Sequence, residues 1–594
     1  MRITYNDKLN KLLNPYLESL LKEKSSLEPE TLTLFDLFME DLDMGGRYGI
    51  FSEILEPRLE EIIREENIES IANLMDGRLN TLFRYMLGDE FAGLFHTYLQ
   101  LEARCPHTIG YDRRAQRSAH PSNHLDHARD AWLQFLKLRA TGFSVEAILK
   151  GGNTPEDTEE FSGYMNSSYW LAAQIAQGNE KVIEYLNQVL TSENNVHRLQ
   201  RWYLHAIAIS GHRPLLELEG KLLLAAKLQE GLRQAIVETM DEGCPESYLY
   251  LFSIIYNNGL QRFASVKRSI AVCTGIGEQD SSERITNKYV ELIWNFLNHP
   301  ETARNTLQSK DTVELYLALW SIGFYDTDEI RAIVPDIIRK GAKHQIQTLL
   351  YFLRCTQSSQ MNHLISKDAF EVWHDDPKVV AAILPLYMDG LYLSRYSDNK
   401  EAPTLSDYFE TPEEAVRHYG YLKQVYQSIS AKEVYSSYVF PWDCVVLTRS
   451  DVVLKMAYIA WMTNDIRLRE ELCTYLPALE SYNRASYIGI VLARTESKVE
   501  QEYVLQSLGD RSADIRDEAY KVLSEMSLSP EQYQHIEELL RFKYSEMRIN
   551  AINLLMKQPE AQLAASIRRL LSDKNAERRL AGLDMMKSIR NVDF

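Results

Sequence analysis

The sequence has few cysteines and no cysteine pair. Six cysteines are spread over 594 residues, and none belongs to a C-x-x-C motif. Scattered thiols in a chain of this length are typical of reduced, mostly buried side chains rather than of a disulfide framework. We therefore expect free thiols at Cys105, Cys244, Cys273, Cys355, Cys444 and Cys473.

Long apolar runs are missing too. No stretch of about 18 apolar residues occurs, so we expect no membrane-spanning helix. The segment from Met1 to Asp7 lacks the apolar core of a secretory signal. The chain carries 84 acidic and 65 basic side chains, a net charge of −19. This balance argues against nucleic acid as a partner, although a local basic groove could still exist. We expect a cytoplasmic protein with no membrane partner.

Motifs of catalysis are absent as well. The sequence contains no G-x-S-x-G, no P-loop and no G-x-G-x-x-G after a strand. Cys105 and His107 lie close in sequence, but a nucleophile and its base usually come from distant parts of a chain. We predict no catalytic residues and no cofactor. This favours a non-enzymatic protein without deciding the question.

Signals for helices run from end to end. Thr154, Thr411 and Ser529 each precede Pro-Glu, so a hydroxyl can cap the first turn and proline fits its start. Asp326 offers the same geometry with a carboxylate. Pro335 interrupts the helix that follows, which predicts a kink or a break. Hairpin turns between alternating apolar residues are hard to find. The sequence predicts an almost entirely α-helical chain.

The last hundred residues repeat one pattern of four positions three times, at steps of 32 and then 30 residues. The copies are Leu508, Arg516, Ala519 and Leu523, then Leu540, Arg548, Ala551 and Leu555, then Leu570, Arg578, Ala581 and Met585. A degraded fourth copy is Leu476, Arg484, Tyr487 and Val491. A fixed period of this length with helical spacing marks stacked helix pairs. We predict an all-α fold, an α-solenoid of irregular helix pairs ending in HEAT-like repeats.

The C-terminal triplet resembles HEAT repeats. Their second helix is preceded by a turn aspartate and carries an arginine followed three residues later by a small residue. The matches are Asp510, Arg516 and Ala519, then Arg548 and Ala551, then Asp573, Arg578 and Ala581. The middle copy has Phe542 in place of the aspartate, and Asp573 is one position late. The resemblance implies that each arginine bonds to a turn aspartate or a carbonyl, as opposed to forming a functional ladder.

Two stretches without helical periodicity suggest soft boundaries. They divide the chain into an N-terminal helical region (1–100), a connector loop (101–127), central irregular helical repeats (128–390), a loop or linker (391–410) and C-terminal HEAT-like repeats (411–594). Tyrosines gather around the second stretch, between Tyr387 and Tyr438. They could form a binding surface for peptides, because tyrosine is favoured in interface cores, or they could pack between helices.

A wider resemblance rests on the segment from Ile109 to Ser118, together with the helical body and the HEAT-like end. It is similar to a bacterial family in which a helical domain of unknown function precedes a second large uncharacterised domain, in proteins sometimes labelled molybdate-regulator-like. The resemblance implies no established activity. It implies that the partner is the companion domain on the C-terminal side, or another protein.

The first non-periodic stretch holds the densest cationic patch and the only ligand-type cluster. Arg113, Arg114 and Arg117 suit bidentate binding of an anion, or they pair with acidic helices. His120, His124 and His127 are weak candidates for a metal site, because HExxH and CxxC spacings are missing. We predict no metal site there and treat the segment as a polar loop and helix start.

The last helix carries Leu583, Met586 and Ile589, which would line an uncapped end of the array. The leading hypothesis is therefore a non-enzymatic scaffold for protein–protein interaction, with these three residues as the binding site for its partner. The alternative is a nucleic-acid-binding or nucleic-acid-acting protein, similar to the bacterial alkylpurine glycosylases built on HEAT-like repeats, that holds phosphates with Arg113, Arg114 and Arg117.

Overall fold

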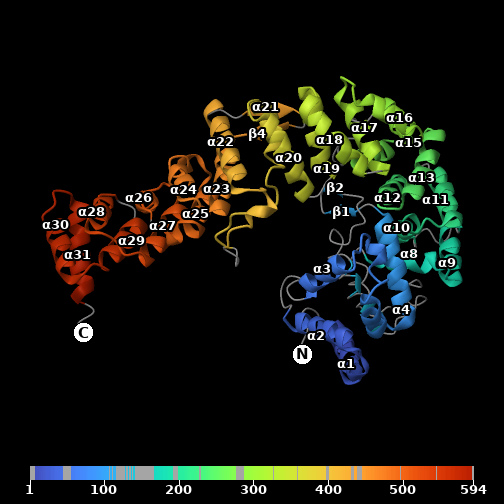
Figure 1. Ribbon diagram of the computed structural model, residues 1–594, viewed down its shortest axis with the longest axis horizontal. Helices are drawn as coiled ribbons and strands as arrows, with labels where there is room; N and C mark the ends of the chain where they lie inside the picture. Colours follow the sequence, from blue (N-terminus) through green and yellow to red (C-terminus); the bar gives the residue numbers. More distant parts are fainter. Residues whose placement is uncertain are drawn as a thin grey trace. The chain divides into compact units, whose positions relative to one another are not determined.

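The computed structural model in Figure 1 describes residues 7–590 apart from a set of short segments. These segments are 45–54, 106, 110–111, 116–127, 129–130, 133–134, 137, 141–165, 192–198, 227–228, 276–285, 326, 357–358, 397–400, 430–433, 438–443, 496 and 543–544. The described chain is predominantly helical, so the prediction of an all-α fold is confirmed. It forms two compact units, residues 1–335 with 352–358 and residues 336–351 with 359–594.

The first unit consists mainly of helices. They are α1 (Asp7–Glu23), α2 (Pro29–Met44), α3 (Leu55–Glu65), α4 (Leu79–Arg104), α8 (Asn166–Ala176), α9 (Glu180–Thr191), α10 (Arg201–Ser210), α11 (Arg213–Ala225), α12 (Glu230–Asp241), α13 (Pro245–Asn257), α14 (Ala264–Cys273), α15 (Asn287–Asn298), α16 (Pro300–Thr306) and α17 (Thr312–Tyr325). In one row α8, α10, α12 and α14 contact in series, and in a second row α9, α11, α13, α15 and α17 do so. Each helix of these two rows therefore packs on the next helix of its own row.

Two helices each contain a point where the sequence passes from one unit to the other. They are α18 (Thr327–Lys340) and α19 (Lys343–Thr356). Of the two outcomes predicted at Pro335, the break is wrong, because α18 runs through this residue as one helix, and the kink stays a prediction. Proline removes one backbone hydrogen bond. The apolar residues on both sides of it, Ile330, Val334, Ile337 and Ile338, are nonetheless buried, and their burial offsets that loss.

The helices of the second unit repeat the two-row packing. They are α20 (Ser359–Trp373), α21 (Pro377–Ile383), α22 (Pro412–Ser428), α23 (Arg449–Thr463), α24 (Ile466–Leu472), α25 (Ser481–Ile490), α26 (Lys498–Ser507), α27 (Ala513–Glu525), α28 (Pro530–Leu539), α29 (Ser545–Leu555), α30 (Glu560–Leu571) and α31 (Ala576–Arg590). The series α25, α27, α29, α31 forms one row and α24, α26, α28, α30 the other.

The repeated positions of the C-terminal triplet lie where the packing predicts. All nine leucine, alanine and methionine positions of the three copies are buried. Ala519, Ala551 and Ala581 face neighbouring helices, where a larger side chain would push the rows apart. Two of the predicted caps are also present. Thr411 accepts from the backbone N–H of Glu414, and Ser529 forms a capping box with Gln532. Thr154 and Asp326 lie outside the described residues.

Two short antiparallel hairpins interrupt the helices. One pairs β1 (His107–Ile109) with β2 (Asp112–Ala115), and the other pairs β3 (Val434–Ser437) with β4 (Cys444–Leu447). The first falls in the stretch expected to be a connector loop, and the second falls in the region expected to hold only helical repeats. Within the described ranges, no helix combines the length and apolar character needed to cross a membrane.

Candidate functional site

An exposed apolar row runs along α31, the red helix at the C-terminal end of the second unit in Figure 1. Leu580, Leu583, Met586 and Ile589 expose 47%, 54%, 49% and 38% of their surface. Neighbours in this row lie on adjacent turns about 60° apart around the helix axis, so the row winds around the helix and Leu580 and Ile589 are about 180° apart. We call these four residues the α31 surface. It contains all three residues that the sequence predicted as a partner-binding site.

The opposite side of α31 is fixed against the preceding repeat. Ala581 and Met585 are buried there. Arg548 on α29 donates to Glu577 at 3.1 Å and to Asp584 at 2.7 Å, the two carboxylates of α31. These contacts fix α31 against α29, and they leave the two carboxylates next to Leu580, which lies three residues after Glu577 and four before Asp584.

Arg548 belongs to a series of arginines that connect successive repeats. Arg484 on α25 lies 3.1 Å from Asp510, which precedes α27. Arg516 on α27 lies 3.6 Å from Glu546 on α29 and donates to the carbonyl of Asp510 at 2.9 Å. Arg578 likewise bonds to Asp573 at 2.6 Å. Arg516 and Arg578 therefore make the predicted bonds to a turn carbonyl or aspartate, whereas Arg548 bonds instead to two carboxylates of α31.

An aromatic cluster occupies the surface of the second unit at the loop that follows α21. Tyr392 and Tyr396 are exposed, and the Tyr482 hydroxyl on α25 lies 3.0 Å from that of Tyr392 and 2.9 Å from that of Ser394. Arg395 lies over the Tyr396 ring at 4.9 Å. Other tyrosines of the dense stretch, such as Tyr387 and Tyr419, are buried. The region thus divides into packing tyrosines and a small exposed group.

Backbone strain positions this loop. Met388 adopts a φ of 52°, a left-handed conformation that is uncommon for a residue with a side chain. Its N–H donates to Nδ1 of His363 at 2.9 Å, and its side chain is fully buried. The Tyr458 hydroxyl on α23 donates to the carbonyl of Leu391 at 2.9 Å. These bonds fix the chain just before Tyr392.

A buried polar network links α20, α22 and the end of α21. Glu371, Glu414 and His418 present ligand-type atoms within 4.8 Å of one another. The Tyr387 hydroxyl lies 2.8 Å from His418 Nδ1, and Glu371 Oε1 lies 3.3 Å from Nε2. Burial lowers the pKa of His418 to about 4. A neutral imidazole can therefore accept from Tyr387 and donate to Glu371.

The two carboxylates of this network already form ion pairs with basic side chains. Lys367 lies 3.0 Å from Glu414, and Arg417 lies 2.6 Å from Glu371. Two negative and two positive charges balance, so a divalent cation would add uncompensated charge to a largely buried site. Tyr387 and His418 are inaccessible to solvent. This arrangement connects α20 and α22 with the segment that follows α21.

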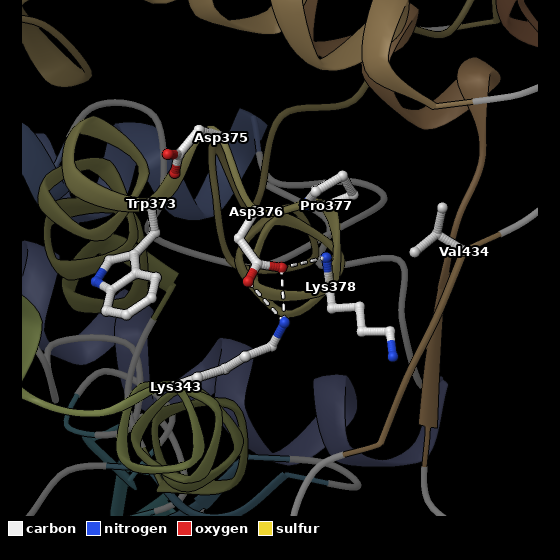
Figure 2. Close-up of a pocket in the computed structure, with 7 residues that line it drawn as sticks. All are labelled: Lys343, Trp373, Asp375, Asp376, Pro377, Lys378 and Val434. Atoms are coloured by element: carbon white, nitrogen blue, oxygen red, sulfur yellow. Dashed lines mark hydrogen bonds and ion pairs between the residues drawn. The ribbon is translucent and has the colours of Figure 1, made fainter.

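A surface cleft of about 670 Å³ lies in the second unit and is shown in Figure 2. It is lined by Lys343, Trp373, Asp375, Asp376, Pro377, Lys378 and Val434. Its central carboxylate is satisfied internally, since Asp376 pairs with Lys343 at 2.6 Å and caps α21 through the N–H of Lys378 and Val379. In Figure 2 the Lys378 side chain extends away from this ion pair. The cleft therefore offers few free polar groups to a ligand.

The structure tests the remaining predicted site residues only in part. Arg113 and Arg114 lie in β2, and their side chains are outside the described part of the chain. Arg117, His120, His124 and His127 fall in the undescribed segment 116–127. Among the described cysteines, Cys105, Cys244, Cys273 and Cys473 are buried and belong to no disulfide. Sequence reasoning missed the network of Glu371, Glu414 and His418, whose members lie far apart in sequence and give no motif.

The fold and these surfaces define an all-α protein of two-row helix packing with an exposed apolar row on its last described helix. The chain belongs to a family of unknown function, DUF5724, whose profile matches residues 34–594. No curated protein matches the chain. No solved structure matches it either.

Proposed function

We propose that the chain is an α-solenoid with HEAT-like C-terminal repeats that acts as a non-enzymatic scaffold for protein–protein interaction. The two-row packing within each unit supports the solenoid, because helix pairs that contact only their neighbours build extended surfaces rather than a closed pocket. The arginines at Arg484, Arg516, Arg548 and Arg578 support the likeness to HEAT repeats through their bonds to turns and neighbouring helices.

The α31 surface is the observation that carries the proposal. Leu583, Met586 and Ile589 are the partner-binding residues in this proposal, and Leu580 extends their row. Contiguous exposed apolar side chains cost free energy in water unless a partner covers them. The partner is another protein, or a companion domain of the kind that the resemblance to molybdate-regulator-like bacterial proteins implies.

The test is a comparison of baits in the native cell. The full chain, the Leu583→Glu/Met586→Glu variant and the control Ile549→Glu are each purified with their bound proteins, which are quantified by mass spectrometry. Ile549 is 57% exposed on α29, outside the α31 surface. Proteins retained by the wild type and the control but lost from the double variant are then purified and mixed with the chain, and the complex is measured by light scattering.

We expect a complex with the wild type and the control and none with the double variant, all three being equally helical by circular dichroism. Equal association of all three proteins would contradict this site. A double variant that loses helix content would be replaced by Leu583→Asn, because asparagine occupies the corresponding exposed position 553 of α29.

A further inference from the structure

Lys455 is a lysine of α23 whose ammonium group has no ionic partner within the described residues. Among these residues its Nζ atom makes no hydrogen bond and no ion pair, and it lies 5.5 Å from the centre of the Tyr458 ring. The residue is half-buried, and its nitrogen is not sealed from solvent. The side chain therefore combines a largely buried stem with an amine that a small molecule can reach.

The two carboxylates near this amine are engaged by the backbone. Asp451, one turn before Lys455 on α23, accepts from the N–H and from the hydroxyl of Thr448, both at 2.7 Å. Asp389, in the loop after α21, accepts from the N–H of Gly390 at 2.9 Å. Burial lowers the pKa of the Lys455 ammonium to about 8, and the two carboxylates counteract this only in part.

The other titratable groups around Lys455 supply no negative charge. His363 on α20 accepts from the N–H of Met388 through Nδ1, and its Nε2 lies 2.9 Å from the Tyr408 carbonyl. These two bonds fit an uncharged imidazole. The phenols of Tyr408 and Tyr458 stay protonated at neutral pH, because burial raises the pKa of both. The ammonium is therefore left uncompensated.

A second lysine of the same unit shows the usual arrangement. Lys367 on α20 is buried, and Glu414 lies 3.0 Å from its ammonium. Lys343 likewise pairs with Asp376 at 2.6 Å. A buried charge is normally paired in this way, because an unpaired one costs free energy. At Lys455 that cost disappears only when the nitrogen loses its charge.

The chemistry of the amine decides how the charge can be lost for good. A neutral lysine amine attacks electrophilic carbonyl carbons, and desolvation activates it for this reaction. The imine that an aldehyde would form can be protonated again, which restores the buried charge. An amide stays neutral. The surroundings of Lys455 therefore favour transfer of an acyl group over formation of a Schiff base.

We propose that Lys455 is a site of covalent acylation by small activated acyl donors, namely acyl phosphates or acyl thioesters. The neutral amine forms a C–N bond to the acyl carbon, and the C–O bond to phosphate or the C–S bond to the thiol breaks. The proton released from the nitrogen passes to the leaving phosphate or thiolate. The product is a neutral amide without the uncompensated charge. This site is separate from the α31 surface and does not depend on the scaffold proposal.

The experiment treats the full chain with acetyl phosphate, and in a second arm with acetyl coenzyme A, at about pH 7.5. Mass spectrometry measures the initial rate of acetylation at each lysine. The exposed Lys378 is the control for an ordinary surface amine, and Lys367 is the control for a paired one. The same reaction in about 8 M urea, where the chain unfolds, is the control for the local sequence.

A second measurement uses the same sample. The peptide that spans α23 has a different mass with and without the acetyl group, so its hydrogen exchange can be followed separately in modified and unmodified molecules. Exchange of α23 reports how readily this part of the second unit opens. No variant is needed, so a failure to fold cannot be mistaken for a loss of reactivity.

We expect Lys455 to react at least about fivefold faster than Lys378, because a larger share of its amine is neutral at this pH. Lys367 should react more slowly than either, and the rates of all three lysines should converge in urea. The acetylated peptide should exchange more slowly than the unmodified one. Faster reaction of Lys455 with one donor alone would assign that donor, and faster reaction with both would include acyl phosphates and thioesters.

Three results would overturn the inference. The first is a rate at Lys455 no higher than at Lys378 with either donor. The second is a preference for Lys455 that persists in urea, since it would then belong to the local sequence and not to the folded site. The third is faster hydrogen exchange of the acetylated peptide, which would show that the neutral amide is not favoured there.

Discussion

Arg469 on α24 donates two hydrogen bonds to Glu500 on α26, and both are 2.8 Å long. Glu500 is completely buried, and the Arg469 side chain is nearly so. The pair connects two successive helices of one row. A bidentate contact of this kind combines charge with fixed geometry. Removing one partner leaves the other as a buried, uncompensated charge, which makes the pair a sensitive probe of the packing.

We therefore predict that Arg469→Met destabilises the second unit by about 3–5 kcal/mol, the usual cost of a buried charge without its partner. The measurement is the urea midpoint together with hydrogen exchange of α24 and α26. The matched control is Arg467→Met, whose ion pair with Asp465 is exposed at the surface and should contribute less than about 1 kcal/mol. Similar losses for both variants would contradict the prediction.

Acid should destabilise both units through buried histidines. Burial lowers the pKa of His205 and of His418 to about 4, against 6.5 for an unperturbed imidazole. Between these values the unfolded chain binds more protons than the folded one, so stability falls as the pH drops from about 6.5 to 4. Each histidine contributes roughly 3 kcal/mol at most. In the first unit Glu219 opposes this trend, because burial raises its pKa and protonation favours the folded state.

The clearest test is therefore His418→Gln in the second unit. Urea midpoints of this variant and of the wild type, measured between pH 4 and 8, should show a shallower pH dependence for the variant below pH 6.5. His299→Gln is the control, since this histidine is exposed. Parallel pH profiles for the wild type and His418→Gln would show that the imidazole titrates normally.

Lys455 is expected to oppose folding at neutral pH. Burial lowers the pKa of its ammonium to about 8, although Asp389 and Asp451 partly counteract this. Those carboxylates accept instead from backbone N–H groups, of Gly390 and Thr448. Because the unfolded lysine has a pKa near 10.5, the ammonium destabilises the fold below about pH 8, and stability rises between pH 8 and 10.5.

Replacing Lys455 by methionine should therefore raise the free energy of unfolding at pH 7 by about 1 kcal/mol or more, because methionine keeps the packing of the stem without the buried charge. Lys378→Met, at an exposed position, is the control. A lower midpoint for Lys455→Met than for the wild type would show that the ammonium is favourably bound.

Nucleic-acid binding remains a separate prediction, because the side chains of Arg113, Arg114 and Arg117 lie outside the described residues. We expect no measurable binding of duplex DNA or of RNA at about 50 mM salt, where phosphate contacts are strong. Gel shift and anisotropy over a salt series test this. Binding that weakens steeply with salt and is lost in an Arg113→Ala/Arg114→Ala variant would favour the alternative function.

Local signals predicted the helices well, since they depend on residues near one another in sequence. Thr411 and Ser529 cap helices as expected, and the repeated positions around Ala519 and Ala551 are buried. The break predicted at Pro335 does not occur, because the burial of its apolar neighbours outweighs the local penalty. The hairpin of β3 and β4 was missed because the six residues between its strands contain no Asn-Gly or Asp-Gly turn.

The candidate sites also differ in whether the sequence could predict them. Leu583, Met586 and Ile589 could be predicted from a three-residue interval on one helix, and the structure leaves them exposed. The hydrogen bond between His418 and Tyr387 could not be predicted. It depends on how α22 packs against the segment after α21, and no residue spacing in the sequence encodes that packing. The left-handed backbone of Met388 could not be predicted either, because it accompanies a buried hydrogen bond to His363, a residue distant in sequence.

The contact of each helix with the helix two places along has an evolutionary consequence. In the series α25, α27, α29 and α31, each helix contacts the next one of the row. Such a chain can be lengthened or shortened by a whole pair through unequal recombination, without redesigning the rest. The arginine bonds then act as a standard joint, and selection for a new ligand can concentrate on whichever pair comes last.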